Sequence, residues 1–151
     1  MPNIVHNQLS IEFNNEQEFQ DFEKRIDAPK QAGTEAFKSL AYSLFPPPKD
    51  ENEYEWTIEN YGGKWGDWYT STQHIYRQNK AVYEFDSAWA PLLTLAEKIA
   101  DLTKRKVTLS FWSMDNMYEG LVTIDENGEL IKDEYRELNY EDFEIVPVEE
   151  E

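Results

Sequence analysis

The chain has 151 residues, a formal net charge of −17, two histidines and no cysteine. Its length fits one domain with a buried core, and its aromatic content of 15% argues against disorder. The absence of cysteine excludes disulfides, thiolate metal ligands and cysteine nucleophiles. Its acidity disfavours duplex nucleic acid as a direct ligand. Residues 1–6 lack the features of a signal peptide, and no apolar run is long enough for a membrane span. We therefore expect a cytoplasmic protein with no membrane partner, metal or cofactor.

Hydrophobic periodicity predicts a strand over residues 3–13 and a helix over residues 15–26. Residues 34–50 are not assigned, because three consecutive prolines near their end stop regular structure. Residues 51–68 are interpreted as an aromatic loop, in which Gly62 and Gly63 allow a positive φ or a close backbone approach. The later predicted elements are strands over residues 69–76, 81–86, 106–113 and 118–124, a helix over residues 90–104 and a last strand from Leu130.

This order of elements is typical of an α+β protein with two helices on one face of an antiparallel sheet. It predicts the ferredoxin-like split β-α-β sandwich, followed by a C-terminal β-hairpin and acidic extension. We expect the ferredoxin-like domain to cover residues 1–128. Residues 129–151 would then form an acidic extension that packs on the domain or trails from it.

Four groups of residues together resemble a known family. They are Met1-Pro2-Asn3 before a strand with Asn7 and Leu9, Trp56 to Asn60 with Gly62-Gly63-Lys64-Trp65, Phe85 to Pro91 before a helix, and Tyr118-Glu119-Gly120. Over residues 1–128 they resemble the YubB-type ferredoxin-like domain proteins of conjugative plasmids and phages. The chain departs from the family at two positions. The family has a larger or hydroxylated residue in place of Gly63, and a Ser or Thr in place of Ala90. The resemblance implies the fold and a mobile-element origin, and it implies no catalytic residue.

The acidity is concentrated near the C-terminus, where residues 125–151 contain twelve acids and two bases. Apolar and aromatic residues lie among these acids, and a purely solubilising tail, which is the alternative, does not need them. We therefore predict a phage- or plasmid-encoded inhibitor, not an enzyme. Its carboxylates would occupy the nucleic-acid groove of a basic host partner such as a defence nuclease. The predicted contact residues are Glu129, Asp133, Glu134, Glu137, Glu141, Asp142, Glu144, Trp68, Trp112 and Tyr118.

Aromatic residues around the two glycines predict a structural cluster. We expect Trp56, Trp65 and Trp89 to pack together and hold the Gly62-Gly63 turn against the sheet. Lys64 would lie over one of the rings.

Two other functions stay open. A single-stranded nucleic-acid module would stack bases on Tyr69, Tyr83 and Trp112, with the basic triplet 104–106 (Lys104, Arg105 and Lys106) on the backbone. A small-molecule binder would hold a nucleotide in the tryptophan-lined loop, with Lys64 on its phosphate.

Acid–base chemistry has only weak support in the sequence. Glu84 and Asp86 share one face of a strand and could act as a carboxylate pair. In so acidic a chain such pairs arise by chance, and neither His6 nor His74 accompanies a recognisable nucleophile motif. We assign no catalytic residue.

Overall fold

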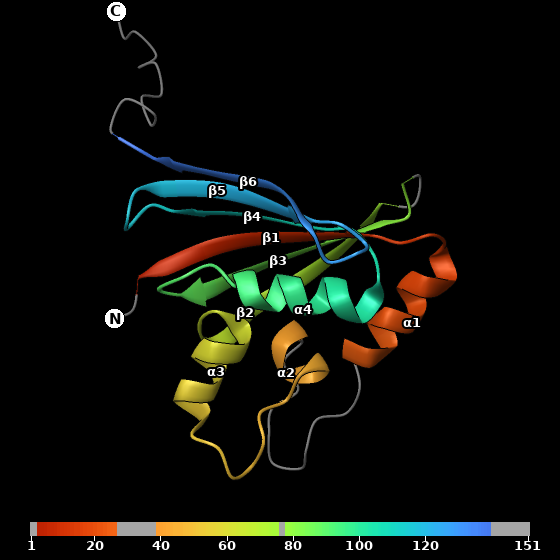
Figure 1. Ribbon diagram of the computed structural model, residues 1–151, viewed down its shortest axis with the longest axis horizontal. Coiled ribbons are helices and arrows are strands. Elements are labelled where there is room, and N and C mark those ends of the chain that lie inside the picture. Colours follow the sequence, from red (N-terminus) through yellow and green to blue (C-terminus); the bar gives the residue numbers. More distant parts are fainter. Residues whose placement is uncertain (1–2, 27–38, 76–77, 140–151) are drawn as a thin grey trace, which may run out of the picture.

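The computed structural model describes residues 3–26, 39–75 and 78–139. Within them the chain folds as an α+β protein with one antiparallel sheet of six strands and four helices (Figure 1). The strands are β1 (Ile4–Glu12), β2 (Lys64–Ile75), β3 (Lys80–Ala88), β4 (Val107–Ser113), β5 (Tyr118–Ile124) and β6 (Leu130–Glu137). The helices are α1 (Glu16–Ile26), α2 (Leu40–Leu44), α3 (Glu53–Tyr61) and α4 (Leu93–Thr103).

The sheet has the strand order β2-β3-β1-β4-β5-β6, with every neighbouring pair antiparallel. The described helices lie on one side of it in Figure 1, and we call the other side the open face. Side chains alternate along a strand, so β1 points Val5, Leu9 and Ile11 into the core and His6 and Gln8 to the open face. The open face is therefore the place where polar side chains of several strands meet.

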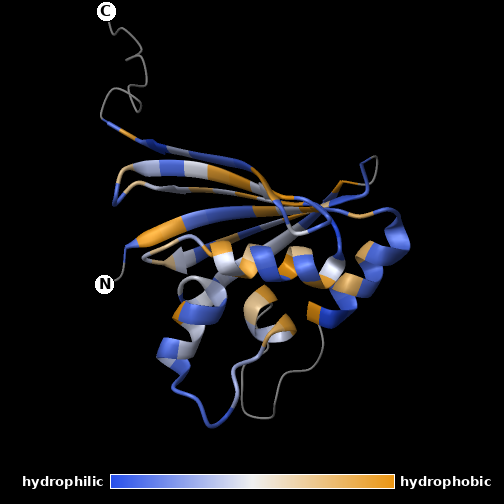
Figure 2. Cartoon of the chain, in the orientation of Figure 1, coloured by the Kyte–Doolittle hydropathy of each residue, from blue (hydrophilic) through white to orange (hydrophobic). Residues whose placement is uncertain are grey.

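The predicted α+β class, antiparallel sheet and six strands are confirmed, but the structure has two helices beyond the two predicted, α2 and α3. The described part of the C-terminal extension contains β6, which pairs with β5 as the sixth strand. All eight residues of β6 are exposed, and Figure 2 shows the strand coloured mostly as hydrophilic. β6 thus forms one edge of the sheet.

The prediction of a loop over residues 51–68 is wrong, because α3 lies within this segment. The Asn52 side chain caps the helix by accepting a hydrogen bond of 3.2 Å from the Glu55 backbone N–H. Gly62 ends the helix in the left-handed region, with φ of 89°. A Cβ on Gly63 would stand 2.7 Å from Leu92 Cδ2, so this glycine lets β2 begin close to the start of α4.

A buried carboxylate connects α2 to β2. Asp67 is 5% exposed and accepts hydrogen bonds of 2.8 Å from Ser39 Oγ, Leu40 N and Ala41 N, and another from Thr70 Oγ1. It therefore binds the first free N–H groups of a helix too short to be stable alone.

Tyr61 holds the neighbouring corner of the fold. Its ring is fully buried, and its hydroxyl donates a hydrogen bond of 2.5 Å to the Phe45 carbonyl oxygen. Burial raises the pKa of the Tyr61 hydroxyl well above its usual value, so this side chain stays a neutral donor.

No helix in the described part of the chain is long and apolar enough to cross a membrane.

Candidate functional site on the open face

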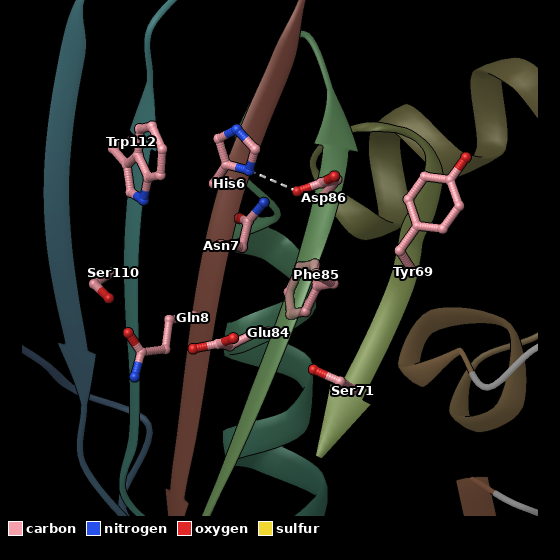
Figure 3. Close-up of a pocket in the computed structure, with 10 residues that line it drawn as sticks. All are labelled: His6, Asn7, Gln8, Tyr69, Ser71, Glu84, Phe85, Asp86, Ser110 and Trp112. Carbon is pink, nitrogen blue, oxygen red and sulfur yellow. Dashed lines mark hydrogen bonds and ion pairs between the residues drawn. The ribbon is translucent and has the colours of Figure 1, made fainter. Parts of the chain in front are cut away.

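A hollow of about 350 Å³ lies on the open face across β2, β3, β1 and β4 (Figure 3). Strand register brings its residues together. His6 stands opposite Asp86 on one side and Trp112 on the other. Gln8 stands in the same way between Glu84 and Ser110. Cross-strand partners share a face of the sheet, so these side chains form two adjacent rows.

His6 is held from both sides. Its Nδ1 donates a hydrogen bond of 2.8 Å to Asp86 Oδ1, drawn as a dashed line in Figure 3. Its ring stacks on Trp112 with 4.3 Å between the ring centroids. Trp112 nevertheless remains 45% exposed, so part of the indole still faces solvent above the hollow.

Tyr69 forms the opposite wall from an unusual backbone position. Its φ is 55°, in the left-handed region that residues with large side chains rarely adopt, and its side chain is 88% exposed. The pairing of β2 with β3 shifts register on both sides of Trp68, between Lys64 and Trp68 and between Trp68 and Ser71. Such irregularities re-aim side chains, and here Tyr69 lines the hollow.

The hollow carries uncompensated negative charge. Among the described residues, its lining includes the carboxylates of Glu84 and Asp86 but no lysine or arginine. Asp86 is engaged by His6, whereas Glu84 is exposed and has no hydrogen bond or ion pair within the described residues. The predicted placement of Glu84 and Asp86 on one face of a strand is confirmed, and the structure adds His6 between them and Trp112.

A second hollow of about 430 Å³ continues along the open face toward β6 and shares Ser110 with the first. Its charges are balanced locally. The Arg136 guanidinium pairs with Glu119 on the neighbouring strand. Lys132 Nζ lies 3.6 Å from Glu134 Oε1. The excess of acid on this face is therefore at Glu84 and Asp86, on β3.

The predicted acidic contact residues do not share one surface. Glu134 lies opposite Leu121 on the open face, whereas Asp133 and Glu137 lie opposite Val122 and Tyr118 on the other face. Glu129 is exposed just before β6. The remaining predicted acids lie outside the described residues: Glu141, Asp142 and Glu144.

The predicted aromatic contacts are separated as well. Trp112 is on the open face, whereas Tyr118 lies on the helix side and stacks on Tyr135 with 5.7 Å between ring centroids. Burial raises the pKa of the Tyr118 hydroxyl above its usual value. Trp68 is half-buried and stacks on Trp65 at 5.9 Å.

The tryptophans expected to form one cluster lie in different surroundings. Trp56 meets Tyr61 edge-on at 5.3 Å, Trp65 stacks on Trp68, and Trp89 is half exposed. The Lys64 ammonium lies 4.0 Å from the centroid of the Trp65 ring, so its charge faces an aromatic surface.

The residues of the nucleic-acid alternative are only partly available. Tyr69 and Trp112 line the same hollow. Tyr83 is fully buried, so it cannot stack on a base.

The basic triplet 104–106 is bound to acids of the chain itself. Its ion pairs are Lys104–Asp101 at 2.9 Å, Arg105–Glu18 at 2.5 Å and Lys106–Glu12 at 3.7 Å. The hydrogen bonds from Arg105 hold the pKa of the Glu18 carboxyl below its usual value.

No metal site is found within residues 3–26, 39–75 and 78–139, where no three His, Asp or Glu side chains gather suitably.

No family model matches the chain, and no curated protein matches it. A solved structure of the protein api92 from Yersinia pseudotuberculosis, described with the family model DUF1281, is similar at 17% identity and a TM-score of 0.48. The match covers 66% of this chain and 36% of that one, so this chain spans little more than a third of that protein's length. A likeness at this level assigns no function.

Proposed function

We propose that the chain is an acidic interaction protein, encoded by a phage or plasmid, that inhibits a basic nucleic-acid-handling protein of its host. A defence nuclease is the partner that fits this role. Carboxylates of the chain would stand where the phosphates of the nucleic acid bind. Attraction between opposite charges would speed the encounter.

The observation that carries the proposal is the local neutralisation of basic side chains. Five basic side chains that follow α4 or lie on β6 form ion pairs with neighbouring carboxylates. They are Lys104, Arg105, Lys106, Lys132 and Arg136. With a net charge of −17, the surface that a partner meets is dominated by acids. Long-range attraction to a basic groove follows from that excess.

The edge position of β6 suggests how a groove would accept the acids. The strand borders the sheet, and its acids point to both faces, with Glu134 on one side and Asp133 and Glu137 on the other. A groove that receives this edge would contact both sets at once. A flat partner surface would contact only one set.

Capture of the partner from host lysate tests the proposal. We expect the tagged protein to retain a nucleic-acid-binding protein at low salt and to release it at high salt, because salt screens exposed charges. Mass spectrometry identifies the retained protein. Retention of nucleic acid itself, or of the same proteins at both salt concentrations, would contradict the proposal.

A second candidate is binding of a single-stranded nucleic acid, favoured by Tyr69 and Trp112 in one open-face hollow. The acids beside these rings oppose it. The third candidate is a nucleotide bound at the tryptophan-lined loop, where the Lys64 ammonium lies over the Trp65 ring and would contact its phosphate. Absence of single-strand binding at low salt would remove the second candidate, and absence of thermal stabilisation by nucleotides would remove the third.

We also propose that the fold is ferredoxin-like and that the chain is related to the YubB-type proteins. We propose a cytoplasmic location in the host cell. Supporting the fold, β1 and β3 lie between β2 and β4, and α1 and α4 precede β2 and β4 in the chain. In this interpretation α2, α3, β5 and β6 are additions to the four-stranded core.

A further inference from the structure

We propose that the hollow between Tyr69, Glu84 and Trp112 receives an arginine side chain of the basic partner. The inference deepens the proposed function, on which it rests, by assigning a specific contact within it. It adds a contact in the middle of the open face to the contacts proposed at β6.

The described lining of the hollow is negatively charged. Two carboxylates line the hollow without any lysine or arginine, and Glu84 has no ion pair or hydrogen bond within the described residues. A cation is therefore the ligand that complements it. Asp86 is tied to His6, so Glu84 is the carboxylate free to form a new pair.

The spread of acceptors favours a guanidinium over an ammonium. Around Glu84 lie the side-chain oxygens of Gln8, Ser71 and Ser110, all lining the same hollow (Figure 3). A guanidinium carries five N–H donors in a planar fork, and it can bind a carboxylate through two of them while others reach neighbouring oxygens. The ammonium of lysine has three donors at one point and is more strongly hydrated.

The walls suit a planar cation. The Trp112 indole and the Tyr69 ring line the same hollow, in the row of His6 and Asp86 next to the acceptors (Figure 3), and guanidinium groups stack on such rings. Tyr69 adds a separate indication. A tyrosine that is 88% exposed and held at a φ of 55° adds no packing that would explain its strained backbone. Strain of this kind concentrates at binding sites.

The experiment titrates isotope-labelled protein with three capped tripeptides, Gly-Arg-Gly, Gly-Lys-Gly and Gly-citrulline-Gly. NMR shifts of the Trp112 indole N–H and the Gln8 side-chain amide report occupancy. We expect the arginine peptide to bind most tightly, the lysine peptide more weakly, and the citrulline peptide, which has the same shape without charge, not at all. Equal binding of arginine and citrulline peptides would overturn the inference.

Variants assign the contact. Glu84→Gln should weaken the arginine peptide about tenfold. The matched control Glu59→Gln removes an exposed acid of α3, on the helix side of the sheet, and should leave binding unchanged. Tyr69→Gly should also weaken binding while the melting temperature stays the same or rises, because glycine accepts this φ without strain. Equal effects of Glu84→Gln and Glu59→Gln would refute the assignment.

The two proposals fail separately. If the arginine peptide binds as expected but no basic partner is captured in a salt-dependent way, the proposed function is wrong and the arginine site stands. If a basic nucleic-acid-binding partner is captured and the peptide does not bind the hollow, the arginine site is wrong and the proposed function stands.

Discussion

Replacing Asp67 by alanine is expected to lower the free energy of unfolding by about 3 kcal/mol. The carboxylate accepts hydrogen bonds from Leu40 N, Ala41 N and Ser39 Oγ at 2.8 Å, in an interior position. Alanine would leave these donors without an acceptor, and buried unsatisfied donors are costly. Loss of the bonds would also release α2, a helix of five residues, from β2.

Chemical denaturation followed by circular dichroism measures this effect. Asp67→Asn keeps one oxygen acceptor and should cost less than Asp67→Ala. The control Asp101→Ala removes an exposed carboxylate that pairs with Lys104 across one helical turn, and it should change stability by less than about 1 kcal/mol. If Asp67→Ala is no more destabilising than the control, the carboxylate does not hold α2 in the way described.

Reversing four acids at the β6 edge is expected to abolish capture of the partner at low salt. The variant carries Glu129→Lys, Asp133→Lys, Glu134→Lys and Glu137→Lys. At roughly 0.7 kcal/mol for each exposed charge, affinity should fall about a hundredfold. These residues are exposed, so the fold should survive, and thermal unfolding checks that it does.

A control variant separates position from net charge. It reverses four exposed acids on helices far along the chain from β6: Glu16, Asp21, Glu55 and Glu59. Both variants have the same net charge, so long-range attraction falls similarly in the two. If binding depends on the β6 edge, the control should lose about threefold at most. An equal loss in both variants would show that total charge alone drives binding.

Much of the fold could be predicted from the hydrophobic periodicity and from the residues that begin and end helices and strands. Alternation marked β1 and β4, and the helical stripe marked α1 and α4, because each element buries one face. α3 was missed although Asn52 with Glu55 three residues later forms a capping signal. The aromatic residues and the following glycines are typical of a loop and point the other way.

The site was harder to predict, because it depends on strand register. His6 and Asp86 are 80 residues apart, and only the pairing of β1 with β3 brings them within a hydrogen bond. Alternation did predict that Glu84 and Asp86 share a face. The same rule, applied to Tyr83, places it on the opposite face from Glu84, which is why it is buried and unavailable as a stacking platform.

The strained aromatic positions had no signal in the sequence. Tyr69 has a positive φ, and nothing in its neighbours requires glycine-like geometry. Tyr69 lies within the second of two shifts in the pairing of β2 with β3, and such irregularities are set by the whole sheet. The sequence alone therefore does not distinguish Tyr69 from any other exposed tyrosine.

Competition for the captured partner tests the central claim most directly. The partner is loaded with labelled nucleic acid, and the acidic protein is titrated in at low salt while fluorescence anisotropy follows release. If the acids replace phosphates, each bound protein displaces the nucleic acid, and the β6 charge-reversal variant displaces none at the same concentration. A ternary complex in which partner, nucleic acid and acidic protein remain bound together would contradict the account.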